Sequence, residues 1–222
     1  MSKHVVITGA NRGIGLALTA QYLAQGDTVT AVCRSSSEAL EQLQPSRIIT
    51  DIDVTDTNAV RELAQQLADQ TIDILINNAG LLERDSLGAI HADSLLRQFQ
   101  VNAMGPLLLT DALRSRLHNG SKVVLITSRM GSMTDNGSGG YYGYRMSKAA
   151  LNAAGVSLAR DLEAAGVAVA LLHPGFVQTE MVNNAGDISA DQAATRLIAR
   201  INELTLSSSG QFIHSNGESL PW

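Results

Sequence analysis

The chain of 222 residues is poor in several residue types. Its one cysteine, Cys33, excludes an internal disulfide framework and suits a reducing compartment. Aromatic residues make up only 4% and the net charge is -5, which argues against the stacking platforms and basic patches that bind nucleic acids. The five histidines lack metal-ligand spacing. These absences predict a protein without a nucleic-acid partner or a metal site.

No apolar run approaches the length needed to cross a bilayer. The first strand is expected to begin at about residue 3, which leaves no room for a signal peptide. We therefore expect a cytoplasmic protein that does not bind membranes.

Short apolar runs instead alternate with helical patterns along nearly the whole chain. Strands are expected at Val5–Thr8, Thr28–Cys33, Arg47–Thr50, Ile74–Asn77, Lys122–Thr127, Val167–Leu172 and Gln211–His214. Helices are expected to begin near Gly13, Glu38, Thr57, Asn102, Tyr144 and Ala190. This alternation predicts an α/β doubly wound (Rossmann) fold, with about seven parallel strands and helices on both faces. Without a repeat or linker to divide it, residues 1–222 are expected to form a single domain.

A glycine-rich segment follows the first expected strand. It reads Gly9-Ala10-Asn11-Arg12-Gly13-Ile14-Gly15 and opens a helical pattern. Glycines between a strand and a helix let the backbone approach a pyrophosphate, whose charge then meets the helix N-terminus. The alternative is a tight turn that binds no ligand. Because this turn opens the first strand–helix unit of an α/β chain, we interpret it as a dinucleotide site.

Tyr144 and Lys148 lie four residues apart, so on a helix they share one face. A phenol has an ordinary pKa of ~10, and a neighbouring cation is expected to lower it. Such a tyrosine could exchange a proton with an alcohol oxygen. The same pair also occurs on solvated helix faces, so its meaning depends on the rest of the chain.

Three further motifs end expected strands and should meet at the carboxyl edge of the sheet. They are Asn77-Asn78-Ala79-Gly80, Ser128, and Pro174-Gly175-Phe176-Val177-Gln178-Thr179. Together with the glycine segment and the Tyr144–Lys148 pair, they resemble the short-chain dehydrogenase/reductase family over essentially the whole chain. Within it, the chain is most similar to the C-factor and sniffer-like carbonyl reductases. That narrower likeness rests on residues 128–132, on residues 142–152 and on Leu220-Pro221-Trp222.

The resemblance implies a catalytic set. Tyr144 would be the general acid in carbonyl reduction, and Lys148 would lower its pKa and hold the nicotinamide ribose. Ser128 would donate a hydrogen bond to the substrate oxygen, where negative charge develops. Asn102 would be the fourth member, its carbonyl holding a water molecule.

The resemblance also implies cofactor contacts beyond the glycine segment. Asp53 and Val54 would contact the adenine, and Asn78, Ala79 and Gly80 would flank the adenine ribose. Thr179 would contact the carboxamide of the nicotinamide. The remaining implied cofactor contacts are Tyr144, Lys148, Pro174, Gly175 and Val177.

The sequence offers two interpretations of Asn102. Pro106, four residues later, has no N–H and cannot bond the carbonyl of Asn102 in a helix, which would leave that carbonyl free for water. Alternatively, Pro106 merely lies in the first turn of a helix that starts near Asn102, where proline is tolerated. The residues alone favour neither interpretation.

The end of the second expected strand indicates the cofactor. Chains that prefer NAD usually carry an acidic residue there, whereas an arginine accommodates the 2′-phosphate of NADP. This strand ends in Arg34 without an acid, and Arg12 could reach the same phosphate. We therefore expect NADP(H), with NAD(H) less favoured; two solvated surface arginines are the alternative.

These observations predict an NADPH-dependent reductase of ketones or aldehydes whose partner is a small carbonyl or alcohol substrate. Substrate selection is expected to rest on residues 175–189, with help from residues 130–140. The alternative is a dinucleotide-binding, C-factor-like signalling or regulatory protein with little turnover. Small apolar residues on the helix after Tyr144 also suggest a possible homodimer.

Overall fold

A computed structural model describes residues 2–222 and contains one seven-stranded parallel sheet in the order β3-β2-β1-β4-β5-β6-β7. The strands are β1 His4–Thr8, β2 Thr28–Val32, β3 Arg47–Ile49, β4 Ile72–Asn77, β5 Leu117–Ile126, β6 Ala168–His173 and β7 Phe212–His214. The expected doubly wound fold and all seven strands are confirmed. Within this part of the chain, no helix is long and apolar enough to cross a membrane.

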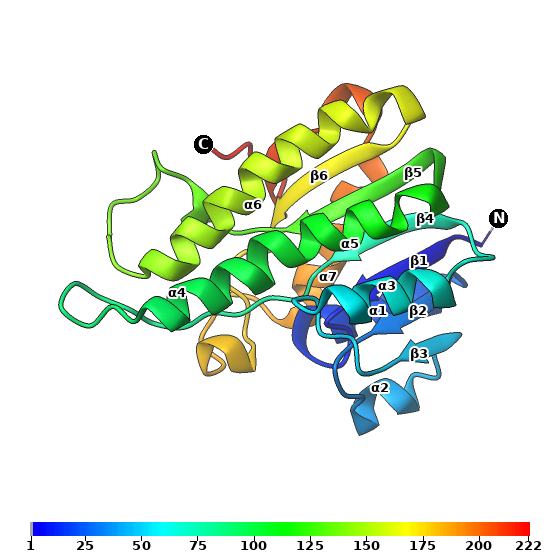
Figure 1. Cartoon of the computed structure of the whole chain (residues 1–222), viewed down its shortest axis with the longest axis horizontal. Helices are drawn as coiled ribbons and strands as arrows, with labels where there is room; N and C mark the ends of the chain where they lie inside the picture. Colours follow the sequence, from blue (N-terminus) through cyan, green and yellow to red (C-terminus); the bar gives the residue numbers. More distant parts are fainter. Residues whose placement is uncertain (1) are drawn as a thin grey trace.

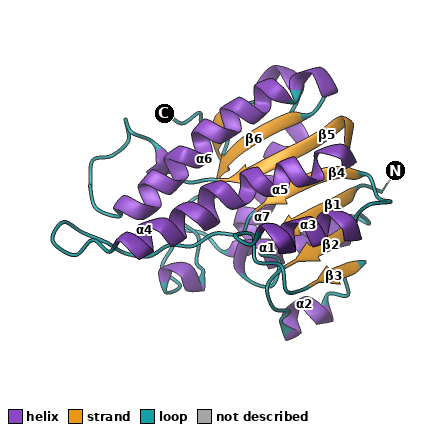
Figure 2. Ribbon diagram, in the orientation of Figure 1, coloured by secondary structure: helices purple, strands orange, loops and turns teal. Residues whose placement is uncertain are grey.

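Helices cover both faces of the sheet (Figures 1 and 2). They are α1 Gly13–Ala24, α2 Glu38–Gln42, α3 Thr57–Gln66, α4 Ala92–Phe99, α5 Gly105–Leu113, α6 Tyr142–Asp161 and α7 Ala190–Glu203. The near face in Figure 1 carries α3, α5 and α6, and α1 and α7 pack behind the sheet.

Two cores follow from the alternation of side chains along each strand. Val6 of β1 faces the core under α3, α5 and α6, whereas its neighbours Val5 and Ile7 face the core under α1 and α7. Both faces of a parallel sheet are buried, so its strands read as continuous apolar runs. This explains why short apolar runs identified the strands.

One helix boundary was wrong in the sequence prediction. The helix expected to begin near Asn102 begins at Ala92, and α4 continues through a π-helical turn, Gln100–Met104, into α5. In this turn the N–H of Gly105 bonds the carbonyl oxygen of Gln100, five residues earlier. A π-turn inserted in an α-helix shifts the apolar periodicity, which is the signal used to locate helices.

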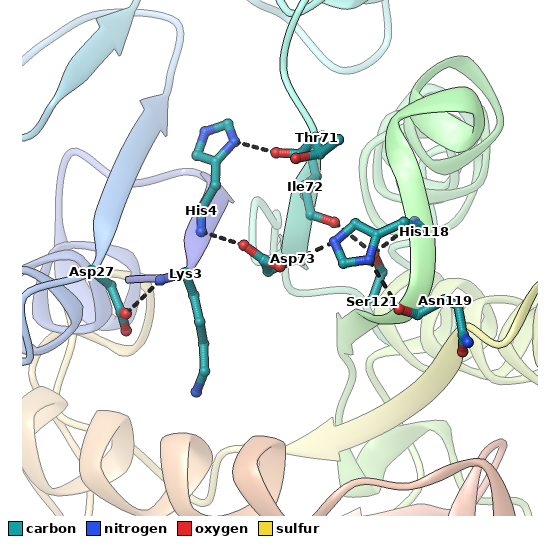
Figure 3. A network of polar contacts seen from close by, with 9 residues as sticks. All are labelled: Lys3, His4, Asp27, Thr71, Ile72, Asp73, His118, Asn119 and Ser121. Atoms are coloured by element: carbon teal, nitrogen blue, oxygen red, sulfur yellow. Dashed lines mark hydrogen bonds and ion pairs between the residues drawn. The ribbon is translucent and has the colours of Figure 1, made fainter. Parts of the chain in front are cut away.

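The amino edge of the sheet is tied together by polar side chains (Figure 3). The Asp73 carboxylate accepts hydrogen bonds from the His4 main-chain N–H (2.7 Å) and pairs with His118 Nε2 (3.0 Å). Ser121 Oγ donates to the Ile72 carbonyl oxygen at 2.7 Å. These contacts join β1, β4 and the start of β5 at the edge opposite the predicted site.

The strand order reverses between β1 and β4, because β1 leads to β2 on one side while β4 continues the sheet on the other. Ligands of doubly wound sheets bind at the carboxyl ends of the strands beside such a reversal. The glycine segment follows β1 there, and Asn78 follows β4. The fold therefore brings the expected motifs to one edge.

Candidate active site

Helix α6 carries Tyr144 and Lys148, and its first turn is fixed by a distant residue. The Asp85 carboxylate accepts hydrogen bonds from the main-chain N–H groups of Tyr142 and Gly143, the latter at 2.9 Å. The preceding Tyr141 takes a left-handed conformation with φ of 52°. A carboxylate at a helix N-terminus satisfies free N–H groups and complements the helix dipole. Asp85 thus sets where α6 begins.

Glycines let α6 approach its neighbours closely. A Cβ on Gly131 would lie 2.8 Å from the main-chain carbon of Lys148, and one on Gly155 would lie 2.6 Å from Leu171 Cδ2. Both contacts are too short for any residue with a side chain. The helix therefore packs directly against β6 and the turn after β5, and its buried face carries the two predicted catalytic residues.

The Tyr144 side chain is buried beside Ser128. Burial raises the pKa of Tyr144 to about 12, and the hydrogen bond with the Ser128 side chain opposes the rise. Ser128 follows β5 by two residues, and its Oγ also accepts a hydrogen bond from the Met130 N–H at 3.1 Å. The structure thus brings the two predicted groups together.

Lys148 is buried one helical turn from Tyr144. Its Nζ lies 5.7 Å from the centre of the Tyr144 ring and donates a hydrogen bond to the Ile126 carbonyl oxygen at 2.8 Å. Burial lowers the pKa of Lys148 to about 7. The expectation that Lys148 lowers the pKa of Tyr144 is wrong for the free chain, because burial dominates and disfavours both charged forms.

Asn102 lies in the π-helical turn and is fully buried. Its Nδ2 donates to the Leu81 carbonyl oxygen (2.7 Å) and to Ser147 Oγ (2.9 Å), while its Oδ1 accepts from the Leu81 N–H (2.7 Å). Ser147 Oγ in turn donates to the Tyr144 carbonyl oxygen at 2.8 Å. The Asn102 side chain therefore holds the segment after β4 against α6.

Pro106 does lie in the first turn of α5, but this helix does not start near Asn102 as a separate element. It continues from α4 through the π-turn, so the whole helical segment begins at Ala92. A π-turn allows proline in a helix interior because the hydrogen-bond pattern is already shifted there. Pro106 still cannot donate to the carbonyl of Asn102.

The glycine segment forms a compact turn into α1. Gly9 has φ of 64°, a region that favours glycine, and a Cβ on Gly15 would collide with the Gly9 carbonyl oxygen. Asn78 Nδ2 braces the turn by donating to the carbonyl oxygens of Thr8 (3.0 Å) and Gly9 (3.2 Å). The side chain of Asn78, which was expected to flank the adenine ribose, thus stabilises the glycine turn.

The turn after β4, which carries Ala79 and Gly80, lies beside the glycine turn. A Cβ on Gly9 would lie 3.0 Å from the Ala79 Cα, so the two turns touch. A Cβ on Gly80 would lie 3.4 Å from Asn102 Oδ1 and 3.9 Å from Lys148 Nζ. Asn11 accepts a hydrogen bond on its carbonyl oxygen from Ser37 Oγ at 2.7 Å. The glycine turn is therefore continuous with the segments that carry Asn102 and Lys148.

The loop after β6 also meets the glycine turn. A Cβ on Gly13 would lie 3.4 Å from Thr179 Cγ2, which brings the start of α1 against this loop. Ile14 packs against the core under α1, and Val177 is buried and bridges to Ile188. Pro174 is held by Ser215, whose Oγ donates to its carbonyl oxygen at 2.8 Å. The predicted cofactor residues thus form one contiguous edge.

The two predicted phosphate-binding arginines have different surroundings. Arg34 is exposed at the end of β2, and Arg12 is exposed and pairs with Glu180 at 3.1 Å. Partial burial raises the pKa of Asp53, but hydrogen bonds from Thr55 and the charge of Arg34 outweigh it and hold the pKa below its usual value. Both guanidinium groups therefore remain accessible to an anion.

Val54 is placed by the π-turn. A Cβ on Gly105 would lie 2.9 Å from Val54 Cγ2, so the helix carrying Asn102 packs directly on the segment after β3. Val54 is buried and its neighbour Asp53 is half-buried at the same edge. The expected adenine-contacting pair therefore lies beside the helical segment that carries Asn102.

A dinucleotide phosphate fits this edge. The glycines of the turn from Gly9 to Gly15 let its backbone fold tightly, because a Cβ at Gly9 or Gly15 would meet neighbouring protein atoms, and the 12-residue helix α1 begins inside this turn. N–H groups at such a helix start attract phosphate. The residues that would hold the group are the glycine segment, Arg12 and Arg34.

Sequence reasoning missed Asp85 and Ser147. Asp85 lies 57 residues before Tyr142 in the chain, and its acceptor role depends on a loop path that no local pattern encodes. Ser147 is buried on the face of α6 that carries Tyr144 and Lys148, and its place directly before Lys148 in the sequence was the available signal. His173 is partly buried, and burial lowers its pKa to about 3.

Comparisons with known proteins agree with this geometry. The model of the short chain dehydrogenase family matches residues 3–190. The chain is 38% identical to 1-hydroxy-2-glutathionyl-2-methyl-3-butene dehydrogenase of Rhodococcus sp. (strain AD45), over 98% of this chain and 99% of that protein. It is 39% identical to C-signal of Myxococcus xanthus, over 73% of this chain and 100% of that protein.

Solved structures are similar along the whole chain. Carbonyl reductase Sniffer of D. melanogaster has a TM-score of 0.92 at 30% identity, with 100% of both chains covered. An NADPH-bound carbonyl reductase from chicken fatty liver has a TM-score of 0.90 at 26% identity, covering 100% of this chain and 99% of that chain.

The pKa of Lys148 predicts a pH signature in stability. The unfolded lysine has a pKa of 10.5, against about 7 in the fold, so between these values the unfolded state binds a proton that the folded state does not. The free energy of unfolding should therefore rise with pH in this window. Replacing the lysine, Lys148→Met, should remove a rise on the order of 4 kcal/mol between pH 7 and 10. Urea denaturation across this range measures it.

The matched control is Arg61→Met, which removes an exposed positive charge on α3. Its stability profile should run parallel to that of the unmodified protein. If the Lys148→Met profile also runs parallel, the lysine is charged in the folded state.

Proposed function

Because the chain belongs to the short-chain dehydrogenase family, we propose that it is an oxidoreductase that uses NADPH to reduce ketones or aldehydes to alcohols. The observation that carries the proposal is the buried Tyr144 phenol beside the Ser128 hydroxyl, one helical turn from Lys148. A pure binding protein has no need of a buried proton donor beside a hydroxyl. Carbonyl reductases among the similar structures support the reaction class.

Bound NADPH would supply the hydride, and the chain supplies the proton and holds the substrate. The Ser128 hydroxyl donates a hydrogen bond to the carbonyl oxygen, where negative charge grows during the reaction. Tyr144 then gives its phenolic proton to that oxygen. The raised pKa of about 12 keeps the phenol protonated at neutral pH, so the free chain is ready for reduction.

Lys148 returns the proton to Tyr144. With a pKa of about 7, its amine can hold or release a proton near neutrality, as a relay requires. Asn102 would continue the path to solvent through a water on its carbonyl oxygen, which Pro106 cannot use as an acceptor. The hydrogen bonds of the Asn102 side chain keep this carbonyl in place.

NADPH is proposed over NADH because the end of β2 presents Arg34 and no acid. Arg12 is the second candidate for the 2′-phosphate, since its partner Glu180 is an exposed carboxylate that an incoming phosphate can replace. Planar guanidinium groups suit phosphate oxygens in paired geometry. The NADPH-bound relative supports the same cofactor.

A signalling role with little turnover is the second candidate, because C-signal is 39% identical to this chain. The complete set of Asn102, Ser128, Tyr144 and Lys148 favours turnover. Net consumption of NADPH in the presence of carbonyl compounds separates the two. Since the Rhodococcus relative is named as a dehydrogenase, oxidation of glutathione-conjugated alcohols with NADP⁺ belongs in the same assay.

We also propose that the chain forms a homodimer through α4, α5 and α6. These helices share the near face in Figure 1 and expose large apolar side chains to solvent. The exposed residues are Leu96, Phe99, Met104, Leu107, Met146 and Val156. Exposed apolar patches of this kind indicate an interaction site.

Sedimentation at micromolar concentration tests the dimer. The unmodified chain should sediment as a dimer and Leu107→Glu as a monomer, because a charge would be buried in the interface. An exposed leucine elsewhere, changed in Leu87→Glu, is the control and should leave the dimer intact. A monomeric unmodified chain would reject the proposed interface.

Removing the proton donor tests the mechanism. The variant Tyr144→Phe keeps the ring packing but has no phenolic proton, and general acid catalysis contributes ~10²–10⁴-fold. We expect carbonyl reduction to fall by this factor while the Kd for NADPH changes little. Steady-state assays with ketones and aldehydes of graded size, together with NADPH fluorescence titration, provide both values.

Tyr142→Phe is the matched control, because Tyr142 contributes its main-chain N–H to the Asp85 cap. Its activity should stay near that of the unmodified chain. Near-normal reduction by folded Tyr144→Phe would refute the assignment of Tyr144.

Reversing the charge at the end of β2 tests cofactor choice. The unmodified chain should have a higher kcat/KM for NADPH than for NADH, and Arg34→Asp should erase or reverse this preference. The carboxylate would repel a 2′-phosphate and accept a hydrogen bond from a 2′-hydroxyl. Arg61→Asp on the exposed surface of α3 controls for net charge. Equal kcat/KM values for both cofactors in the unmodified chain would exclude the two-arginine site.

A further inference from the structure

The chain continues after β7 into an extended segment, residues 215–222, here called the β7 extension. It contacts two loops at the carboxyl edge of the sheet. The β5 loop, residues 129–140, follows Ser128, and the β6 loop, residues 174–188, carries Thr179. Nothing in the proposed mechanism uses the β7 extension, yet it joins the segments on both sides of the proposed site.

The β7 extension holds the β5 loop through polar contacts. The Thr134 N–H donates a hydrogen bond to the Trp222 main-chain oxygen at 3.0 Å. Arg129, the residue after Ser128, pairs with Glu218 at 3.4 Å and with Asp135 of its own loop at 2.8 Å. The β5 loop is therefore tied to the extension at two points, Arg129 and Thr134.

Apolar contacts fix the extension itself to the sheet. The Trp222 ring stacks on Phe212 of β7, with 5.4 Å between ring centroids and 26° between planes. Leu220 is buried, and its N–H donates to the Phe212 carbonyl oxygen at 2.9 Å. Stacked aromatic pairs stabilise contacts beyond their buried area. The Trp222 main-chain oxygen that accepts the hydrogen bond from Thr134 is thus held in place by the packing of Trp222 and Leu220 on β7.

The same extension holds the β6 loop. Ser215 is buried; its N–H donates to the His173 carbonyl oxygen and its Oγ donates to the Pro174 carbonyl oxygen, both at 2.8 Å. A Cβ on Gly175 would lie 3.7 Å from His214 Cε1, so the turn packs against the end of β7. The β7 extension, which is itself fixed on Phe212, therefore contacts both the β5 loop and the β6 loop.

Helix α6 holds the other side of the β5 loop. Arg145, the residue after Tyr144, donates from Nη2 to Ser138 Oγ (2.9 Å) and from Nε to the Gly140 carbonyl oxygen (3.2 Å). The loop is thus held between the catalytic helix and the β7 extension. The exposed Gly, Ser and Asn residues of the loop provide few apolar contacts of their own.

We propose that Trp222 is a positioning residue for the reaction. Through its stacking on Phe212 and its hydrogen bond with Thr134, it holds the β5 loop and thereby the Ser128 hydroxyl against Tyr144. The expected effect of Trp222 on the reaction rate rests on the proposed function. Its expected effect on the order of the β5 loop rests on the loop contacts alone. Misplacement by about 1 Å of a group that contacts the reacting atoms can cost ~10²-fold in rate.

The test compares Trp222→Ala with Trp222→Phe, which keeps an aromatic ring on Phe212. Leu206→Ala is the matched control, because Leu206 and Trp222 are both 44% exposed and Leu206 lies in a separate turn, Leu206–Ser208. In Trp222→Ala, amide hydrogen exchange in residues 129–140 should speed up by roughly 10-fold, because local opening becomes easier. Trp222→Phe should restore most of the protection, and Leu206→Ala should leave it unchanged.

Kinetics separate positioning from a general loss of stability. In Trp222→Ala we expect kcat to fall roughly 10-fold while the Kd and stoichiometry of NADPH binding stay unchanged. In a Ser128→Ala background, the same change should have little further effect, because the residue acts through Ser128. Full additivity of the two changes would overturn the proposed link to Ser128.

Unchanged hydrogen exchange in residues 129–140 of Trp222→Ala would overturn the proposal outright. If the unmodified chain turns over no carbonyl compound, the proposed function fails. The exchange measurement on the cofactor-free chain then still decides whether Trp222 holds the loop.

Discussion

The burial of two titratable side chains, one helical turn apart on α6, is the constraint on which the site depends. Burial disfavours the phenolate of Tyr144 and the ammonium of Lys148, so the phenol stays protonated near pH 7 while the lysine amine can hold or release a proton there. Burying them requires α6 to lie against the end of β5, where Lys148 finds the Ile126 carbonyl as its acceptor. A proton donor kept protonated by burial is suited to reduction.

Much of the surrounding structure serves this placement. Gly131 lets the backbone of α6 pass close to the turn after β5. The Asp85 carboxylate accepts hydrogen bonds from the first main-chain N–H groups of α6. Asn102 and Ser147 then link the segment after β4 to the same helix. The contacts come from segments far apart in sequence, and the parallel sheet brings them together because the strands end at one edge.

The strands could be predicted from sequence, and the residues of the candidate site could be proposed from it, because their signals are local. Buried parallel strands appear in the sequence as apolar runs, and the four-residue spacing of Tyr144 and Lys148 indicates that they share one face of a helix. The start of α4 was missed because a π-turn interrupts the periodicity. The cap by Asp85 was missed because it depends on the path of a loop. The pKa of Tyr144 was expected to fall, but burial raises it. The extent of burial depends on tertiary packing, which a local sequence pattern does not specify.

The central claim is that this edge transfers a hydride from a nicotinamide to a carbonyl carbon while Tyr144 supplies the proton. The most direct measurement follows deuterium from NADPH labelled at the transferring C4 position, during reduction of an aldehyde in ordinary water. We predict an alcohol product that carries one deuterium on the former carbonyl carbon, detected by mass spectrometry. An unlabelled alcohol, or labelled NADPH left unconsumed with every carbonyl compound of a graded panel, would contradict the account.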